Sequence, residues 1–578
     1  MHGLVKVLSC AVLALPGSVQ AAHAQTPFEQ LFNPRTALSI ILEMPQATWA
    51  AMAAEQPASG VCIFAWPPSS PRYPWHSTNA TVITEGETRT EQLYQQIGIK
   101  KKSFCGSFHT TKPSLTLTLD RNLPANEAVA ESHLGTTHLS LENSRQDSDL
   151  FRQCAGYYVF RIMGLPAPMC SFAALYRRDA ASAPLVFLGL YVLTEPVKKD
   201  FFRRRADLTN VPSGSLYEFE FPDDFTQIII ANNQLQVEWS ATANQDFLFA
   251  VNQVQNFPAT ALAKTLDLPP FIDFWATEIF LKSGDGFLSN RNNAFVFDDP
   301  PAQTPIQRTR FRFIPHGLDQ ILNVGAKPSV SQTSILAQMA HLDNGLRYQL
   351  IRTLASMGDQ IEIADVPAHI DSFVPLVVRL WRSADILFGS DPNRAMQMAE
   401  NVRRAAQQAV LDLRTVFGHG VVTPLTNTPI RLVGPHHVQC VTRVPTAVSF
   451  EVGRAACTNL PVQQWTFEPA ATTMTNLGFQ QSLKLYRVRN QASPRCLTVG
   501  APFTDGSGRH KLEIATCNPQ ADEQRFLLVQ REGRSFELRA FTENRCAHFS
   551  DSAVTNDGRP AIYLGTCDGS SKNLIVTE

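Results

Sequence analysis

The chain has 578 residues, of which 50 are basic and 51 acidic, so its formal net charge at pH 7 is −1. This balance gives no electrostatic basis for binding nucleic acid or an acidic membrane surface, and we expect no nucleic acid among its partners. A length of 578 residues predicts two to four domains.

The first 24 residues have the pattern of a signal peptide. A weakly basic start with Lys6 leads into a short apolar run, and Ala22 to Ala24 form an A-x-A cleavage site. The run is too short to be a transmembrane segment, and no other stretch is long and apolar enough. We expect cleavage after Ala24 and a mature protein that is secreted, periplasmic or located at the cell surface. Lipoprotein processing at Cys10 is the less favoured alternative.

The N-terminal third predicts an α+β lobe. Residues 36–52 have the pattern of a strand followed by a helix, and residues 97–120 that of two strands around a polar loop. Residues 149–168 are amphipathic and end in glycine and prolines, which predicts a helix and its end. Residues 185–197 are largely apolar and predict a buried strand.

A polar loop with the sequence GDGFLSNRNNAFVFDD occupies residues 284–299. Asp285 precedes Asn290 by five residues, which is the Asp-x-x-x-x-Asn spacing of protein kinase catalytic loops. A further carboxylate, Asp319, follows the next strand-like run, RFRFI. Carboxylate and amide oxygens can hold Mg²⁺ against phosphate oxygens. The loop therefore predicts a phosphoryl-transfer site, and the simpler alternative is a polar turn ahead of a strand.

The remainder of the chain changes from helices to strands. Residues 344–418 carry apolar residues at spacings of three and four, which predicts amphipathic helices, and the Thr/Pro-rich residues 421–429 predict a linker. Beyond the linker, short apolar runs and polar turns form three similar units, which predicts a threefold all-β array. Pairs of cysteines spaced by 17, 21 and 21 residues indicate one disulfide per unit: Cys440, Cys457, Cys496, Cys517, Cys546 and Cys567.

Five motifs occur in an order that resembles the spore-coat CotH kinases, which are exported atypical relatives of protein kinases. They are Lys112-Pro113-Ser114, Gly164 to Pro168, Gly189 to Glu195, Asp285 to Asn293, and Pro315 to Gln320. The resemblance extends over roughly residues 35 to 415. It implies an atypical kinase fold and Mg²⁺-dependent (or Mn²⁺-dependent) transfer from ATP to a Ser or Thr hydroxyl of a protein.

The same resemblance implies roles for particular residues. Lys112 and Glu195 would contact ATP, and Asp285 would accept or orient the acceptor hydroxyl. The metal ligands would be Asn290, Asn293 and Asp319. The chain departs from the family pattern in the loop Lys102 to Phe108 and at Gln153, where a glutamate that could pair with the lysine is common. These departures leave open an adhesin, a surface-binding protein that uses a kinase-like scaffold without catalysis.

The C-terminal units resemble the ricin-type β-trefoil lectins through Gln463 to Trp465, echoed by Gln524 to Phe526. That resemblance implies that the residue after each Gln-x fills the core and that each cysteine pair closes one lobe. The sugar-orienting aspartate usual in the family is absent from all three lobes. A remaining sugar site would lie in the third lobe, and its candidates are His548, Phe549 and Asp551. The alternative is a spacer or protein-binding module.

Together the patterns predict a multidomain protein. A signal peptide covers residues 1–24, an α+β atypical kinase-like domain residues 25–420, a linker residues 421–429, and an all-β trefoil residues 430–578. We expect a secreted protein kinase that the trefoil directs to a glycan or another surface ligand.

Overall fold

The computed structural model describes residues 25–577 with internal gaps. The gaps are residues 57–72, 103–104, 206–213, 222, 228–234, 299–305, 324–332, 419–428, 435–438, 446–449, 459, 471, 474–481, 484, 504–506, 532–534, 544, 555–559 and 568–574. The predicted signal peptide, most of the predicted linker and Cys62 lie outside the described residues. Within the described part of the chain, no helix is long and apolar enough to cross a membrane.

Seven strands near the N-terminus close into a barrel in the order β1-β2-β3-β4-β5-β7-β6. Their bounds are β1 Ala37–Glu43, β2 His76–Glu85, β3 Arg89–Lys101, β4 Leu115–Thr118, β5 His138–Glu142, β6 Cys170–Arg178 and β7 Val186–Thr194. Closure depends on a parallel pairing of β1 with β6, while the other neighbours are antiparallel. Alternate apolar residues such as Leu38, Ile40 and Leu42 fill the interior, as the period of a strand requires.

Three short helices accompany the barrel, α1 Pro27–Leu31, α2 Gln46–Ala54 and α3 Asn126–Leu134. The first is closed by a capping box, in which the Thr26 hydroxyl accepts from the Glu29 amide and the Glu29 carboxylate accepts from the Thr26 amide.

A second sheet, in the order β11-β10-β8-β9, lies among helices in the middle of the chain. Its strands are β8 Ser215–Phe219, β9 Gln236–Trp239, β10 Ala294–Asp298 and β11 Arg312–Pro315. The helices are α4 Arg152–Ile162, α5 Lys199–Arg203, α7 Gln245–Asn256, α8 Pro258–Thr265, α9 Leu268–Leu281, α10 Phe287–Asn290, α11 Ile335–Leu342, α12 Asn344–Ile363, α13 Val366–Leu380 and α14 Arg394–Phe417. A common core rich in phenylalanine joins these helices to the sheet. The helical zone predicted for residues 344–418 is confirmed.

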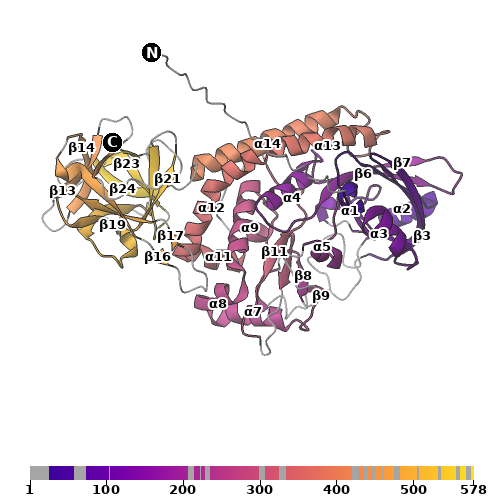
Figure 1. Cartoon of the computed structure of the whole chain (residues 1–578), viewed down its shortest axis with the longest axis horizontal. Helices are drawn as coiled ribbons and strands as arrows, with labels where there is room; N and C mark the ends of the chain where they lie inside the picture. Colours follow the sequence, from indigo (N-terminus) through magenta and orange to yellow (C-terminus); the bar gives the residue numbers. More distant parts are fainter. Residues whose placement is uncertain are drawn as a thin grey trace, which may run out of the picture.

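The C-terminal residues form a separate β-structure at one end of the molecule (Figure 1). One 12-stranded sheet contains β12 Ile430–Val433, β13 Gln439–Pro445, β14 Phe450–Ala456, β15 Gln464–Pro469, β18 Tyr486–Asn490, β19 Arg495–Pro502, β20 His510–Thr516, β21 Phe526–Gln530, β22 Ser535–Ala540, β23 Arg545–Val554, β24 Pro560–Thr566 and β25 Ile575–Thr577. β16 Thr472–Thr473 pairs with β17 Ser482–Leu483. The chain is therefore multidomain, with a mixed α and β part followed by strands.

The predicted cysteine pairs are confirmed. Disulfides join Cys440 to Cys457, Cys496 to Cys517, and Cys546 to Cys567. Each pair closes one antiparallel hairpin, β13–β14, β19–β20 or β23–β24. A fourth disulfide joins Cys154 of α4 to Cys170 of β6, and Cys105 is also disulfide-bonded. These bonds agree with export to an oxidising compartment.

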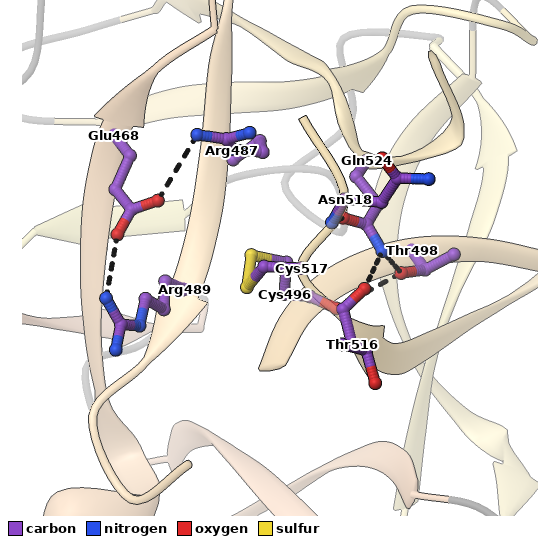
Figure 2. Close-up of a disulfide and its surroundings, with 9 residues drawn as sticks. All are labelled: Glu468, Arg487, Arg489, Cys496, Thr498, Thr516, Cys517, Asn518 and Gln524. Carbon is purple, nitrogen blue, oxygen red and sulfur yellow. Dashed lines mark hydrogen bonds and ion pairs between the residues drawn. A yellow bond between two sulfur atoms is a disulfide. The ribbon is translucent and has the colours of Figure 1, made fainter. Parts of the chain in front are cut away.

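Two of the predicted units share a glutamine with the same hydrogen bonds. In the second unit Gln524 Oε1 accepts from the Asn518 amide at 2.7 Å, and its Nε2 donates to the Thr516 carbonyl at 2.9 Å (Figure 2). In the first unit Gln463 Oε1 accepts from the Thr458 amide at 2.6 Å, and its Nε2 donates to the Ala456 carbonyl at 2.9 Å. The glutamine thus fixes the chain beside each disulfide, which supports the interpretation as repeats.

The β-structure packs directly on the helical part. Arg531 donates to the carbonyls of Arg414 and Thr415, and both Arg531 and Arg539 donate to that of Val416, so the two guanidinium groups satisfy the C-terminal end of α14. Apolar residues of the β-structure also enter the core of the helical part: Leu485, Leu527, Val529 and Phe541.

Candidate active site

The polar loop predicted as a catalytic loop connects α9 to β10 and gathers its amides around one carboxylate. Asp285 Oδ1 accepts from Asn290 Nδ2 at 2.5 Å and from Asn292 Nδ2 at 3.1 Å. Its Oδ2 accepts from Asn293 Nδ2 at 3.1 Å. All four side chains keep some exposed surface. The structure therefore brings Asp285, Asn290 and Asn293 together in one partly exposed loop.

The turn after β11 places Asp319 beside this loop. The His316 amide donates to the Asn293 carbonyl at 3.0 Å, and Gln320 Nε2 lies 3.4 Å from Asp285 Oδ2. Gly317 has a positive φ of 54°, and a Cβ there would lie 2.5 Å from Asn293 Oδ1, so only glycine fits this approach. The two predicted metal-binding segments are thus joined by hydrogen bonds.

Asp319 lies in an acidic environment. Burial raises its pKa to about 8, and the nearby carboxylates of Asp147, Glu142 and Asp285 add to the rise. Burial likewise raises the pKa of Asp147 to about 7. Within the part of the chain that the structure describes, Asp319 forms no ion pair. A carboxylate with excess negative charge around it and part of its surface exposed suits a divalent cation.

Helix α4 packs against the turn that carries Asp319 and donates hydrogen bonds to it. Arg152 Nη1 donates to the Leu322 carbonyl at 3.1 Å and also to that of Ile321, while its Nη2 donates to Asp149 at 2.7 Å. Gly156 lets the helix approach, since a Cβ there would lie 2.8 Å from Leu318 Cδ1. Gln153, which the sequence suggested as a weakened lysine partner, is buried, and its amide lies 3.5 Å from the Tyr157 hydroxyl.

A lysine–glutamate pair that the sequence analysis missed lies at the same cluster. Lys102 Nζ donates to Glu142 Oε1 and, at 2.9 Å, to the Ser140 hydroxyl. Their side chains are 22% and 17% exposed, so both remain accessible. Burial opposes ionisation of Glu142, but Lys102 lowers its pKa below the usual value, and His316 contributes to the lowering. In the sequence, Lys100-Lys101-Lys102 has the pattern of an exposed basic run. Glu142 can be identified as the partner of Lys102 only because β5 pairs with β4 in the structure.

Lys112 does not reach this cluster. Its side chain has no exposed surface, and Nζ lies 2.8 Å from Asp385 Oδ2. Burial lowers the pKa of Lys112 to about 8, and Asp385 partly opposes this. Glu195 is also buried, where it pairs with Arg204 and Arg205 and accepts from the Met169 amide. The two residues predicted to contact ATP, Lys112 and Glu195, therefore form buried ion pairs inside the protein.

Of the three residues predicted to bind a sugar in the third C-terminal unit, at least Phe549 is not exposed. Phe549 is only 3% exposed and belongs to the core of the strands. His548 stacks on Tyr563 with ring centroids 4.9 Å apart. Asp551 lies on β23, and its side chain is outside the described residues. Among the described residues, only Glu537, Cys546 and Cys567 form a close metal-type group, and its cysteines are consumed by a disulfide.

Comparison with known proteins agrees with the motif order. Residues 104–385 match the family model described as CotH kinase protein, and this range includes Glu142, Asp285, Asn290 and Asp319. Lys102 lies two residues before it. No curated protein matches the chain.

Several solved structures are similar to part of the chain. The designed 3-fold symmetric protein ThreeFoil shares 14% identity, with 26% of this chain and 96% of that chain covered and a TM-score of 0.21. The BEL beta-trefoil shares 12%, with 27% and 96% covered and a TM-score of 0.22. The cytolethal distending toxin of Haemophilus ducreyi shares 17%, with 27% and 83% covered and a TM-score of 0.19.

Proposed function

We propose that the chain is a CotH-like protein kinase that transfers the γ-phosphoryl group of ATP to a Ser or Thr hydroxyl of a protein. The observation that carries the proposal is the arrangement of charges around Asp319. The carboxylates of Glu142 and Asp285 lie near enough to raise its pKa, Glu142 pairs with Lys102, and Asp285 accepts from Asn290. The match to the CotH kinase model supports a kinase-like function.

The cluster contains the groups that phosphoryl transfer needs. The transferred group is highly charged, so catalysis depends mainly on positioning and electrostatic stabilisation. Lys102, oriented by Glu142, takes the phosphate-binding role predicted for Lys112, because its side chain is 22% exposed whereas that of Lys112 has no exposed surface. Asp285, which accepts hydrogen bonds from four side-chain amides, would orient the acceptor hydroxyl.

Asp319 and Asn290 are the residues that would hold Mg²⁺ or Mn²⁺, with Asn293 as a further amide. When bound, the cation would neutralise charge on the phosphate oxygens. Asn290 and Asn293 turn their amide nitrogens toward Asp285, which leaves their oxygens as donors for a metal. The excess negative charge around Asp319 fits this role.

Labelled ATP tests the proposal directly. We expect the wild type to label itself, and Asp285→Ala and Asp319→Ala each to lower uptake at least a hundredfold, in keeping with the usual contribution of a positioned base or metal ligand. Asp273→Asn is the matched control, since Asp273 is a partly buried acid of α9 whose carboxylate faces Thr353 rather than the loop. Equal uptake in all four proteins would contradict the site assignment.

The C-terminal strands would then direct the kinase to a glycan or another surface ligand. Three disulfide-closed hairpins and two equivalent glutamines support a ricin-type trefoil. Binding of the full chain to a glycan array tests this part, and a spacer or protein-binding module is favoured if no glycan binds.

The second candidate is an adhesin on a kinase-like scaffold. It is favoured by the enclosure of Lys112 and by disulfides that indicate an exterior where ATP is scarce. A ligand that binds the native state raises its melting temperature. A rise with Mg²⁺-ATP or Mn²⁺-ATP supports the kinase, and no rise with either supports the adhesin.

A further inference from the structure

A buried glutamate of α9 holds the loop that carries Asp285 and Asn290. Glu278 is 5% exposed. Its Oε1 accepts from the Phe287 amide at 3.0 Å, and its Oε2 accepts from the Leu288 amide at 2.9 Å. Each carboxylate oxygen therefore receives one backbone N–H from the first turn of α10.

The loop is built around this carboxylate. A Cβ at Gly286 would lie 2.4 Å from Glu278 Oε1 and 2.6 Å from the Ser283 hydroxyl, so a side chain has no room there. Phe287 lies two residues after Asp285, and Leu288 lies two residues before Asn290. The carboxylate thus fixes the backbone midway between the two polar groups whose side chains meet at 2.5 Å.

Stability alone is a poor reason for an acid at this position. Among the described residues no cation pairs with Glu278, and an unpaired buried carboxylate is costly. Burial raises its pKa to about 8, although both backbone N–H bonds oppose the rise. An isolated helix of four residues, the length of α10, is unstable, because helix nucleation is unfavourable. Without Glu278 the amides of Phe287 and Leu288, at the start of α10, would lose these two acceptors.

We propose that Glu278 is a positioning residue that sets the separation of Asp285 and Asn290 by clamping the backbone between them. This inference rests on the proposed kinase function for its effect on turnover. Glu278 does not touch the phosphate or the acceptor, and it acts only through the loop.

The test compares Glu278→Gln with Asp273→Asn in the full chain. Glutamine keeps the shape of the side chain and one acceptor, but its NH₂ group faces the second backbone N–H. Asp273→Asn removes a charge from the same helix without touching the loop. Three quantities are measured for each protein: melting temperature, labelled-ATP uptake, and hydrogen exchange of the backbone amides of residues 284–293.

We expect Glu278→Gln to speed exchange of the Phe287 and Leu288 amides at least tenfold and to lower the uptake rate at saturating ATP at least tenfold. Its melting temperature should fall no further than that of the control. Exchange and uptake equal to those of Asp273→Asn overturn the inference, as does an equal change in exchange throughout the chain, which indicates general destabilisation. If the wild type takes up no label, the proposed function fails, and the exchange data still decide whether Glu278 clamps the loop.

Discussion

Lys112 Nζ lies 2.8 Å from Oδ2 and 3.0 Å from Oδ1 of Asp385, and neither side chain has any exposed surface. Asp385 also accepts from the Leu190 amide of β7 at 2.7 Å and from the Leu387 amide at 2.8 Å. The pair therefore ties the barrel to the segment between α13 and α14. Because the Lys112 side chain has no exposed surface, its ammonium group is out of reach of a ligand outside.

Lys112→Met is expected to destabilise the protein by about 3 kcal/mol or more, because removing one partner leaves the other charge buried and unpaired. Urea unfolding measures this loss. Phosphoryl transfer per folded molecule should stay within about threefold of the wild type, since Lys112 lies outside the site. A stable Lys112→Met variant without activity would return the phosphate-binding role to Lys112.

Lys102→Met is expected to have the opposite effects, a small loss of stability and a large loss of activity. The Lys102–Glu142 pair is partly exposed, so its loss should cost about 1 kcal/mol or less in unfolding free energy. Uptake of labelled phosphate should fall at least a hundredfold, because the partly exposed lysine proposed to bind phosphate is removed. Retained uptake in Lys102→Met, measured beside Lys112→Met at equal folded concentration, would contradict the assignment.

The partners of Lys102 and Lys112 could not be predicted from the sequence, whereas the loop of Asp285 and Asn290 could. Asp285 and Asn290 are five residues apart in one motif, so the resemblance to the CotH kinases was enough to predict a shared loop, and their side chains do meet. Lys102 finds Glu142 40 residues away and Lys112 finds Asp385 273 residues away. Each distant partner depends on which strands become neighbours, and no local spacing encodes that.

The same distinction applies to the fold. The cysteine pairs were predictable because each closes a local hairpin, and the amphipathic helices were predictable from their period. The barrel was not predicted, since its closure needs β1 to pair in parallel with β6, more than 100 residues later. Phe549 lies in the core of the strands, contrary to its predicted role at a sugar site, because a shift of one residue along a strand decides between core and surface.

The acidic cluster predicts an unusual pH dependence. The pKa values of Asp147 and Asp319 are raised by burial to about 7 and about 8, above the roughly 3.9 of an unfolded aspartate. Between about pH 4 and 8 the native state therefore binds more protons than the unfolded state, and stability falls as pH rises. Melting temperatures measured from pH 5 to 8 without divalent cations should show this decline, and Asp319→Asn should weaken it.

Mg²⁺ supplies the control for this prediction. A cation bound at Asp319 favours the ionised carboxylate, so Mg²⁺ should raise the melting temperature more at pH 8 than at pH 5. Asp319→Asn should respond less to Mg²⁺ at both values. A wild-type response that is independent of pH and unchanged in Asp319→Asn would exclude Asp319 as the main ligand.

The last prediction concerns the junction between the strands and α14. Glu537 is fully buried, and its carboxylate lies 2.5 Å from Arg531 and 2.8 Å from Arg539, the two residues that donate to the last carbonyls of the helix. Cations at a helix C-terminus are favoured by the dipole. The same helix carries Asp412, which pairs at 2.7 Å with Lys282, three residues before Asp285. The strands should therefore unfold together with the helical part, although they form a separate structure.

Glu537→Gln is expected to lower the unfolding free energy by about 3 kcal/mol, because both guanidinium groups lose their buried counter-charge. Calorimetry should show a single transition in the wild type and two in the variant, as the junction weakens before either part melts. Glu523→Gln is the matched control, since Glu523 is an exposed acid of the same structure. Two transitions already present in the wild type, or a Glu537→Gln profile equal to that of the control, would show that the strands are only tethered to α14.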